Sequence, residues 1–248
     1  MEILKKNINF NFFGRNINMV IFDYFKAKER NIKDINYDII SKCLESENNC
    51  WEPYQTEITK EILKDGNNIF IDIGTHIGYY SLIALSLGNY VIGIDCNETF
   101  LSFYRENINL NNFKNINIVK TKVDCNFNIE SIVDIKKKIK LIKCDIEGFE
   151  IEFIRSIEGL LENKIIENLI LEISPKKRNE YNEIIELLFK KGYYIYDIGL
   201  SPQRKLDEKI NLDTLQNKNI NLDKIDINKY LCSLDYNQSN FLFTLKKY

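Results

Sequence analysis

Two acidic residues about twenty positions apart mark the part of this chain whose chemistry is easiest to interpret. Asp72 lies near the end of an apolar run that begins at Ile69 and leads into Gly74, and Asp95 ends the next apolar run. A strand, a glycine turn and a helix present backbone N–H groups to a nucleotide-like ligand, and the second carboxylate of Rossmann-like folds holds ribose hydroxyls. The pattern predicts a site for an adenosine-containing cofactor, and S-adenosylmethionine is the one we expect.

The loop between the first strand and its helix supplies most of the expected cofactor contacts. Its glycines have the spacing G-x-x-x-G, whereas dinucleotide sites use G-x-G-x-x-G. A carboxylate buried at Asp72 needs a partner, which a cofactor or a neighbouring amide would supply. His76 is the only histidine of the chain, and we expect it to shape this loop rather than act as a base. Asp124 follows the third strand and is either an acceptor for the adenine amino group or an exposed loop acid. The predicted cofactor residues are Asp72, Gly74, Thr75, His76, Gly78, Asp95 and Asp124.

A second acidic group follows the apolar run 139–144 and predicts the catalytic end of the site. Asp145 and Glu147 would lie at the carboxyl end of a central strand, where open α/β sheets bind ligands. We expect one of them to be a general base, or the acceptor that orients a substrate hydroxyl. Glu150 is expected to cap a helix N-terminus. Glu172 ends another strand at the same edge, and is either a reserve base or satisfied by a neighbouring loop.

Strands and helices alternate after residue 68 and predict an α/β fold. Strands are expected at 69–73, 90–95, 116–120, 139–144 and 168–173, and helices at 78–87, 98–110, 149–162 and 179–191. Because each strand is mostly apolar, the sheet should be parallel and covered by helices on both faces. The apolar runs 193–198 and 241–245 predict an antiparallel pair at the edge.

The chain divides into an extension, residues 1–50, and a domain, residues 51–248. Alternating apolar residues between 7 and 22 predict a β-hairpin, and a helix is expected at 34–44. The domain should begin with a helix from Pro53 to Leu63. A polar segment at about 200–239 is interpreted as a surface insertion.

Composition narrows the class of protein. Hydrophobic residues make up 44% of the chain, which allows a packed core, and the net charge of −2 offers no surplus of basic residues for a nucleic-acid partner. Six cysteines without a C-x-x-C pair, and a single histidine, lack the spacing of a zinc site, so we expect no metal and reduced thiols. No signal peptide and no membrane span are expected, which favours a cytoplasmic protein.

Several motifs, taken in order, resemble the FkbM family of S-adenosylmethionine-dependent methyltransferases. The similarity runs from about Trp51 to Ser174, and a weaker similarity is present in Asn240-Phe241-Leu242-Phe243. Its parts are Trp51-Glu52-Pro53 for W-E-P, residues 71–78 for the D-x-G-A-N-x-G loop, residues 107–111 for N-x-x-L-N, and residues 143–150 for K-x-D-x-E-G-x-E. Thr75-His76 replaces the usual Ala-Asn, and Asp95-Cys96 replaces Glu-Pro.

The resemblance implies a Rossmann-like class I methyltransferase fold with the cofactor over the first two strands. It also implies O-methylation of a small molecule or glycan, often at a sugar or natural-product hydroxyl. Three alternatives remain: an NAD-dependent oxidoreductase, disfavoured by the glycine spacing; an RNA methyltransferase, disfavoured by the acidic balance; and a non-catalytic binding module on the same fold.

Overall fold

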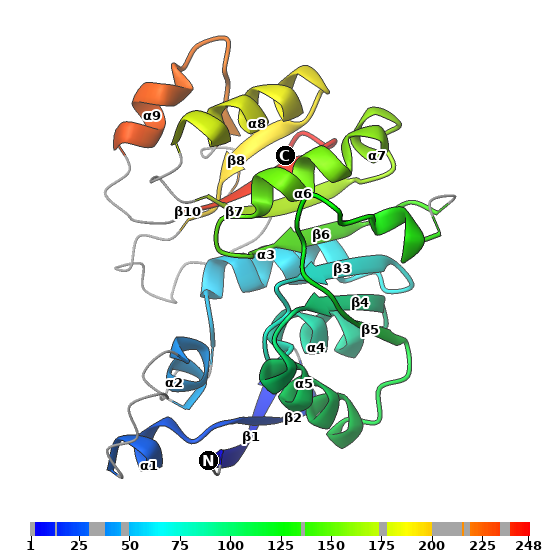
Figure 1. The fold of residues 1–248 in the computed structure, drawn as a ribbon, viewed down its shortest axis with the longest axis vertical. Helices are drawn as coiled ribbons and strands as arrows, with labels where there is room; N and C mark the ends of the chain where they lie inside the picture. Colours follow the sequence, from blue (N-terminus) through cyan, green and yellow to red (C-terminus); the bar gives the residue numbers. More distant parts are fainter. Residues whose placement is uncertain are drawn as a thin grey trace.

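The centre of the molecule is an eight-stranded sheet with helices on both faces (Figure 1). The computed structural model describes residues 3–12, 14–29, 38–45, 50–134, 137–173, 178–199, 215, 219–233 and 239–248. The strands lie in the order β5-β4-β3-β6-β7-β10-β8-β9. The first five are parallel, and β10 lies antiparallel between β7 and β8. The expected fold class is therefore confirmed.

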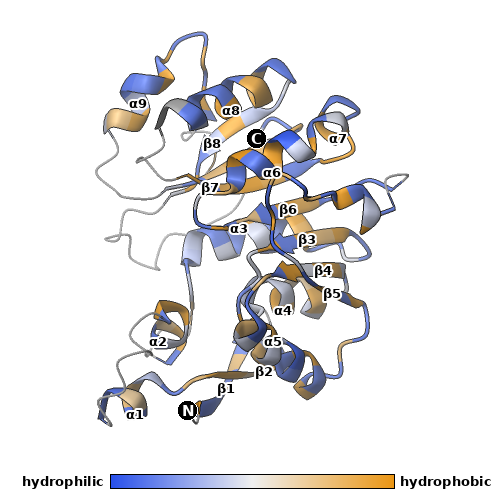
Figure 2. Ribbon diagram, in the orientation of Figure 1, coloured by the Kyte–Doolittle hydropathy of each residue, from blue (hydrophilic) through white to orange (hydrophobic). Residues whose placement is uncertain are grey.

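The sheet strands are short and mostly apolar, as Figure 2 shows by colour. Their bounds are β3 (Ile69–Ile73), β4 (Tyr90–Asp95), β5 (Ile116–Lys120), β6 (Leu141–Cys144), β7 (Asn168–Ile173), β8 (Tyr194–Asp197), β9 (Asn219–Ile220) and β10 (Ser239–Thr244). A separate hairpin is formed by β1 (Lys5–Phe12) and β2 (Arg15–Phe22), as the alternation predicts. The helices are α1 (Tyr24–Glu29), α2 (Ile39–Glu45), α3 (Pro53–Leu63), α4 (Tyr79–Ser86), α5 (Glu98–Leu110), α6 (Glu150–Ser156), α7 (Glu158–Glu162), α8 (Arg178–Lys190) and α9 (Ile227–Ser233).

Each face of the sheet carries its own hydrophobic core because successive strand residues point to opposite faces. In β3, Phe70 packs in the core shared with α3, α4, α5 and the hairpin. The next residue, Ile71, packs in the core shared with α6, α7, α8 and α9. The helices therefore hold the strand ends, and the loops that follow them, in fixed positions.

Two asparagines one helical turn apart attach the hairpin to α5. The Asn107 Oδ1 accepts from the Val20 N–H at 2.6 Å, and its Nδ2 donates to the Val20 carbonyl at 3.2 Å. Asn111 makes the same pair of bonds to Asn18, at 2.9 and 2.6 Å. The two side-chain amides bond to the backbone of β2 as a neighbouring strand would. The N-terminal extension therefore packs directly on the domain.

Several predicted boundaries differ from the structure. The helix expected at 149–162 is two helices, since Ile157 leaves the helical conformation and its buried side chain reaches the core. The helix expected at 34–44 begins at Ile39, with residues 31–37 outside the described part. The strand expected at 139–144 begins at Leu141, and Ile139 makes only a single bridge to Ile166.

The C-terminal third differs most from the prediction. β10 and β8 do pair antiparallel, but β10 lies inside the sheet and β9 forms its edge. Much of 200–239 lies outside the described residues, yet its described part includes β9 and α9. In this described part, Ile220, Ile227 and Leu231 are buried in the core of the domain. No helix of the described ranges is long and apolar enough to cross a membrane.

Candidate active site

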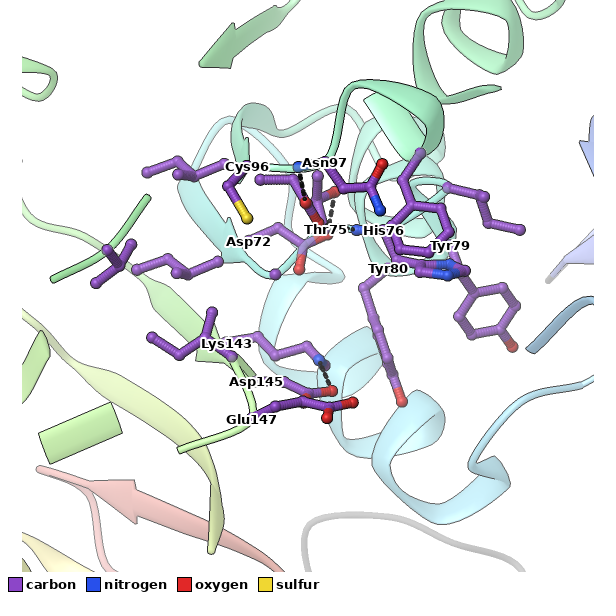
Figure 3. Close-up of a pocket in the computed structure, with 18 of the residues that line it drawn as sticks. Asp72, Thr75, His76, Tyr79, Tyr80, Cys96, Asn97, Lys143, Asp145 and Glu147 are labelled. Atoms are coloured by element: carbon purple, nitrogen blue, oxygen red, sulfur yellow. Dashed lines mark hydrogen bonds and ion pairs between the residues drawn. The ribbon is translucent and has the colours of Figure 1, made fainter. Parts of the chain in front are cut away.

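A cavity of about 520 Å³ opens at the carboxyl ends of the parallel strands (Figure 3). The loops after β3, β4, β5 and β6 line it, together with the end of β7, which is where the alternating order of strands and helices predicts a site. Gly78 and Asp124 are not among its lining residues. The predicted residues that line it are Asp72, Gly74, Thr75, His76, Asp95, Asp145, Glu147 and Glu172.

Only a glycine fits at position 74, where the chain that follows β3 lies against the loop after β6. It has a φ of 76°, and a Cβ at this position would lie 1.8 Å from the Asp145 carbonyl oxygen. Its N–H and that of Thr75 both donate to the Ile94 carbonyl, at 2.9 and 3.1 Å. The glycine thus lets the loops after β3 and β6 approach each other beside the cavity. Gly78 has a different role, since a Cβ there would meet the Tyr104 ring at 2.2 Å.

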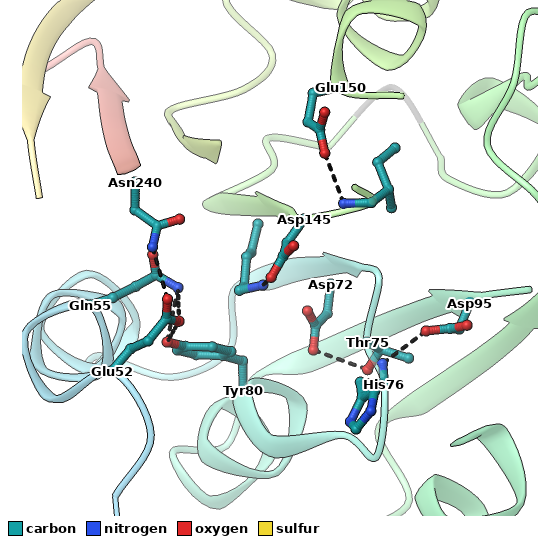
Figure 4. A network of polar contacts seen from close by, with 12 residues as sticks. Glu52, Gln55, Asp72, Thr75, His76, Tyr80, Asp95, Asp145, Glu150 and Asn240 are labelled. Carbon is teal, nitrogen blue, oxygen red and sulfur yellow. Dashed lines mark hydrogen bonds and ion pairs between the residues drawn. The ribbon is translucent and has the colours of Figure 1, made fainter. Parts of the chain in front are cut away.

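Asp72 is a buried carboxyl with one oxygen free to bind a ligand. Its Oδ2 accepts from the Ser81 hydroxyl at 2.6 Å. It also accepts from the Thr75 hydroxyl at 3.0 Å (Figure 4). Its Oδ1 is buried and has no hydrogen-bond partner among the described residues. Burial raises the pKa of Asp72, and the charge of Lys143 and the two hydroxyls counter that rise.

Asp95 and His76 hold the cofactor loop against the end of β4. The Asp95 Oδ2 accepts from the His76 N–H at 2.9 Å, and its Oδ1 accepts from the Asn97 N–H at 2.8 Å. The His76 ring centroid lies 3.8 Å from that of Phe100. Burial lowers the pKa of His76, so the ring is neutral near pH 7. This geometry agrees with a shaping role for His76.

The residues at this end fit S-adenosylmethionine. The unpartnered, buried Oδ1 of Asp72 suits a ligand with a positive charge, and each oxygen of Asp95 can still accept a ribose hydroxyl. Asp124 does not line the cavity, and its Oδ1 accepts from the Asn126 N–H within its own turn. Val123, the residue before it, lines the cavity instead.

Lys143 is a buried basic residue of the site, and its functional position was not predicted from the sequence. Its side chain is 4% exposed, and its Nζ lies 2.9 Å from the Asp145 Oδ2 and 5.0 Å from the Tyr80 ring centroid. Burial opposes its charge, but the carboxylates of Asp145, Asp72 and Glu52 raise the pKa of Lys143 above its usual range. Lys143 therefore keeps its positive charge. It lies at the acidic end of the cavity, which is the end lined by Lys143, Asp145, Glu147 and Glu172.

Asp145 and Glu172 form a hydrogen-bonded carboxyl pair beside Lys143. The strand register aligns Cys144 with Leu171, so Asp145 and Glu172 follow at neighbouring positions. Burial and the charge of Asp145 raise the pKa of Glu172 to about 10. Burial also disfavours the charge of Asp145, yet Lys143 and the hydrogen bond with Glu172 hold the pKa of Asp145 below its ordinary value. Glu172 is therefore protonated and Asp145 ionised near pH 7.

A hydrogen-bond network from three segments, the start of α3, α4 and β10, supports this end of the cavity. The Glu52 Oε2 accepts from the Tyr80 hydroxyl at 2.7 Å and from the Gln55 Nε2 at 2.9 Å, and its Oε1 accepts from the Asn240 Nδ2 at 2.9 Å (Figure 4). Asn240 lies opposite Glu172 in the β10–β7 register. The network thus fixes Tyr80 under Lys143. Glu150 lies in the first turn of α6 but does not cap its N–H groups; it holds the preceding loop instead, because it accepts from the Ile146 and Gly148 N–H groups and from the Tyr181 hydroxyl.

Comparisons with known proteins agree with this geometry. The model of the methyltransferase FkbM domain matches residues 51–195, more than half of the chain. A search of curated proteins found no match. Among solved structures, a putative rRNA-methylase from Clostridium thermocellum has a TM-score of 0.50 at 10% identity, over 77% of this chain and 93% of that one.

Two further solved structures match the chain with lower scores. An rRNA methylase from Streptococcus thermophilus has a TM-score of 0.49 at 13% identity, over 77% of this chain and 93% of that one. A precorrin-6y C5,15-methyltransferase from Geobacter metallireducens has a TM-score of 0.47 at 14% identity, over 76% of this chain and 86% of that one. At such identities the likeness concerns the fold alone.

Proposed function

The chain belongs to the methyltransferase FkbM domain family, and we propose that it methylates a hydroxyl group of a small molecule or glycan with S-adenosylmethionine as the donor. The observation that carries this proposal is the Asp145–Glu172 pair, which lies in the same cavity as the glycine loop and Asp95. A methyl donor at the loop and a hydroxyl at the pair would share one enclosed space. We expect Asp72, Thr75, His76 and Asp95 to hold the cofactor, which supplies a methyl group on a positively charged sulfur.

The residues of the acidic end have distinct roles in this proposal. The ionised Asp145 accepts the hydrogen bond of the substrate hydroxyl and orients its oxygen, and Lys143 fixes that carboxylate. Such positioning contributes up to ~7–11 kcal/mol to a two-reactant step, and a base contributes ~10²–10⁴-fold in rate. Glu147 is exposed at the mouth, where a carboxylate can bind a second hydroxyl.

The charge of the cavity favours a neutral acceptor over a nucleic acid. Its lining includes the acidic residues Asp72, Asp95, Asp145, Glu147 and Glu172, but only Lys122 and Lys143 as lysines among the described residues. Lys143 is paired with Asp145, so it is not available to a phosphate. RNA-binding sites need basic groups for the backbone, and this cavity lacks such a surplus. We also propose a cytoplasmic setting, for which the six free cysteines are the support.

Transfer of labelled methyl groups to a panel of sugars and small alcohols tests this function. An acceptor should be labelled, and its analogue that lacks one hydroxyl should not. Asp145→Asn should lower kcat by about 100-fold or more, since the carboxylate that orients the hydroxyl is lost. Glu130→Gln, an exposed acid outside the cavity, is the matched control. Near-normal kcat in both Asp145→Asn and Glu147→Gln would remove these residues from the chemistry.

A further inference from the structure

The acidic end of the cavity contains more carboxyl groups than its single buried ammonium can neutralise. Lys143 comes from β6, and the carboxyls of Asp72, Asp145, Glu172 and Glu52 all act on it or on one another. Lys122 is the other lysine among the described lining residues, but its Nζ lies 4.5 Å from the Phe149 ring at the mouth. One positive charge therefore faces four acidic groups.

Asp145 and Glu172 follow the aligned residues Cys144 and Leu171, both line the cavity, and the ammonium of Lys143 lies beside them, 2.9 Å from the Asp145 Oδ2. Ionised carboxylates only accept hydrogen bonds, so a pair that shares one must hold a proton between its two groups. Two neighbouring carboxylates do not ionise together unless further positive charge is present. In the absence of a ligand, the pair thus carries one negative charge and one proton.

The other titratable groups around the pair do not supply that positive charge. Glu52 is held by the neutral donors Tyr80, Gln55 and Asn240. Asp72 is held by two hydroxyls, and its Oδ1 remains unpartnered. His76 is neutral because it is buried. A cation in the cavity would therefore be the first additional positive charge near the pair.

We propose that the Asp145–Glu172 pair releases one proton when the positively charged cofactor binds, and takes up the proton of the acceptor hydroxyl during methyl transfer. This inference rests on the proposed function. Methylation of a hydroxyl by a sulfonium yields an ether, a neutral thioether and one proton, with the C–S bond pair left on sulfur. The doubly ionised pair receives that proton from the breaking O–H bond, so each turnover returns it to its singly protonated state.

Calorimetric titration in two buffers of different ionisation enthalpy measures the proton release directly. The probes are S-adenosylmethionine and S-adenosylhomocysteine, which carry the same amino and carboxyl groups and differ in the charge on sulfur. At pH 8 the former should release about one proton more than the latter. The difference should shrink as the pH approaches 10, because the pKa of Glu172 lies near that value.

Two variants assign the proton to the pair. Glu172→Gln should abolish the difference between the two ligands and retain binding of S-adenosylhomocysteine. Glu167→Gln, an acid at the other end of β7 that pairs with Lys140, should leave the difference unchanged. Equal proton counts for the two ligands in the unmodified protein, or a difference that persists in Glu172→Gln, would overturn this inference alone. Failure of both ligands to bind a folded protein would overturn the proposed function, and this inference with it.

Discussion

The two ends of the cavity are held by different kinds of interaction. At the cofactor end, backbone N–H groups of Gly74, Thr75 and His76 donate to the carbonyl of Ile94 and to Asp95. At the acidic end, side chains from segments far apart in the sequence contact one another, and the Asn240–Glu52 hydrogen bond spans 188 positions. The first end is built by local backbone geometry, and the second by the packing of the whole sheet.

This difference has a consequence for mutation. A backbone-held loop tolerates changes of side chain but not of φ, whereas a cluster of buried charges does not tolerate the loss of a partner. Three substitutions test this contrast, beginning with the position where the two ends touch.

Gly74→Ala should have the largest effect, because the new Cβ would collide with the Asp145 carbonyl. The positive φ costs Ala about 1–2 kcal/mol, and separating the loops after β3 and β6 adds to it, so we expect a loss of at least ~4 kcal/mol in unfolding free energy. Gly88→Ala is the matched control, since it has a φ of 85° but no atom within 4 Å. Chemical denaturation of both variants gives the comparison; equal losses would show that the close approach is unimportant.

Lys143→Met should cost about 3–5 kcal/mol in unfolding free energy near pH 7, since it leaves buried carboxylates without their cation. The folded-state pKa of Asp145 is lowered, so the stability from this pair is present above its unfolded pKa and is lost as pH falls through the folded value. The deficit should therefore shrink below pH ~4.

Lys140→Met provides the control for this prediction. Lys140 precedes the same strand and pairs with Glu167 at 2.8 Å, but both side chains are about one third exposed. Its loss should cost less than ~1 kcal/mol. Urea unfolding of both variants from pH 2 to pH 8 checks this, and two deficits that are alike and independent of pH over this range would contradict the role of Lys143.

Asp95→Ala should have the smallest effect, and on binding rather than folding. Loss of a charged hydrogen bond to ribose should weaken S-adenosylhomocysteine binding by tenfold or more, on the scale of ~1.5–3 kcal/mol. Asp124→Ala should leave the affinity unchanged, because Asp124 lies outside the cavity lining. Equal loss in the two variants, measured by calorimetry, would remove Asp95 from the ribose site.

The contrast between the two ends also explains how much the sequence could predict. The strands, the glycine loop and the acids at strand ends are local patterns, and the structure brings Asp72, Gly74, Asp95, Asp145, Glu147 and Glu172 to one cavity. The break at Ile157 and the inclusion of β9 in the sheet were missed, because tertiary packing decided both. Asp124 and Gly78 follow the expected loops but do not line the cavity.

The support of the acidic end could not be predicted from local patterns. Glu52, Tyr80 and Asn240 meet only after the sheet has formed, and nothing in their own segments indicates this contact. One signal was present: Lys143 stands within the apolar run of β6, where a charge is costly unless it is paired. A lysine in a central strand therefore predicts that acidic side chains lie beside it and neutralise its charge.

The central claim is that this cavity binds an S-adenosyl cofactor. Calorimetric titration of the purified protein with S-adenosylhomocysteine, with NAD as the control ligand, tests it most directly. We expect micromolar binding of S-adenosylhomocysteine and none of NAD. A well-folded protein that binds neither ligand, or that prefers NAD, would contradict the claim.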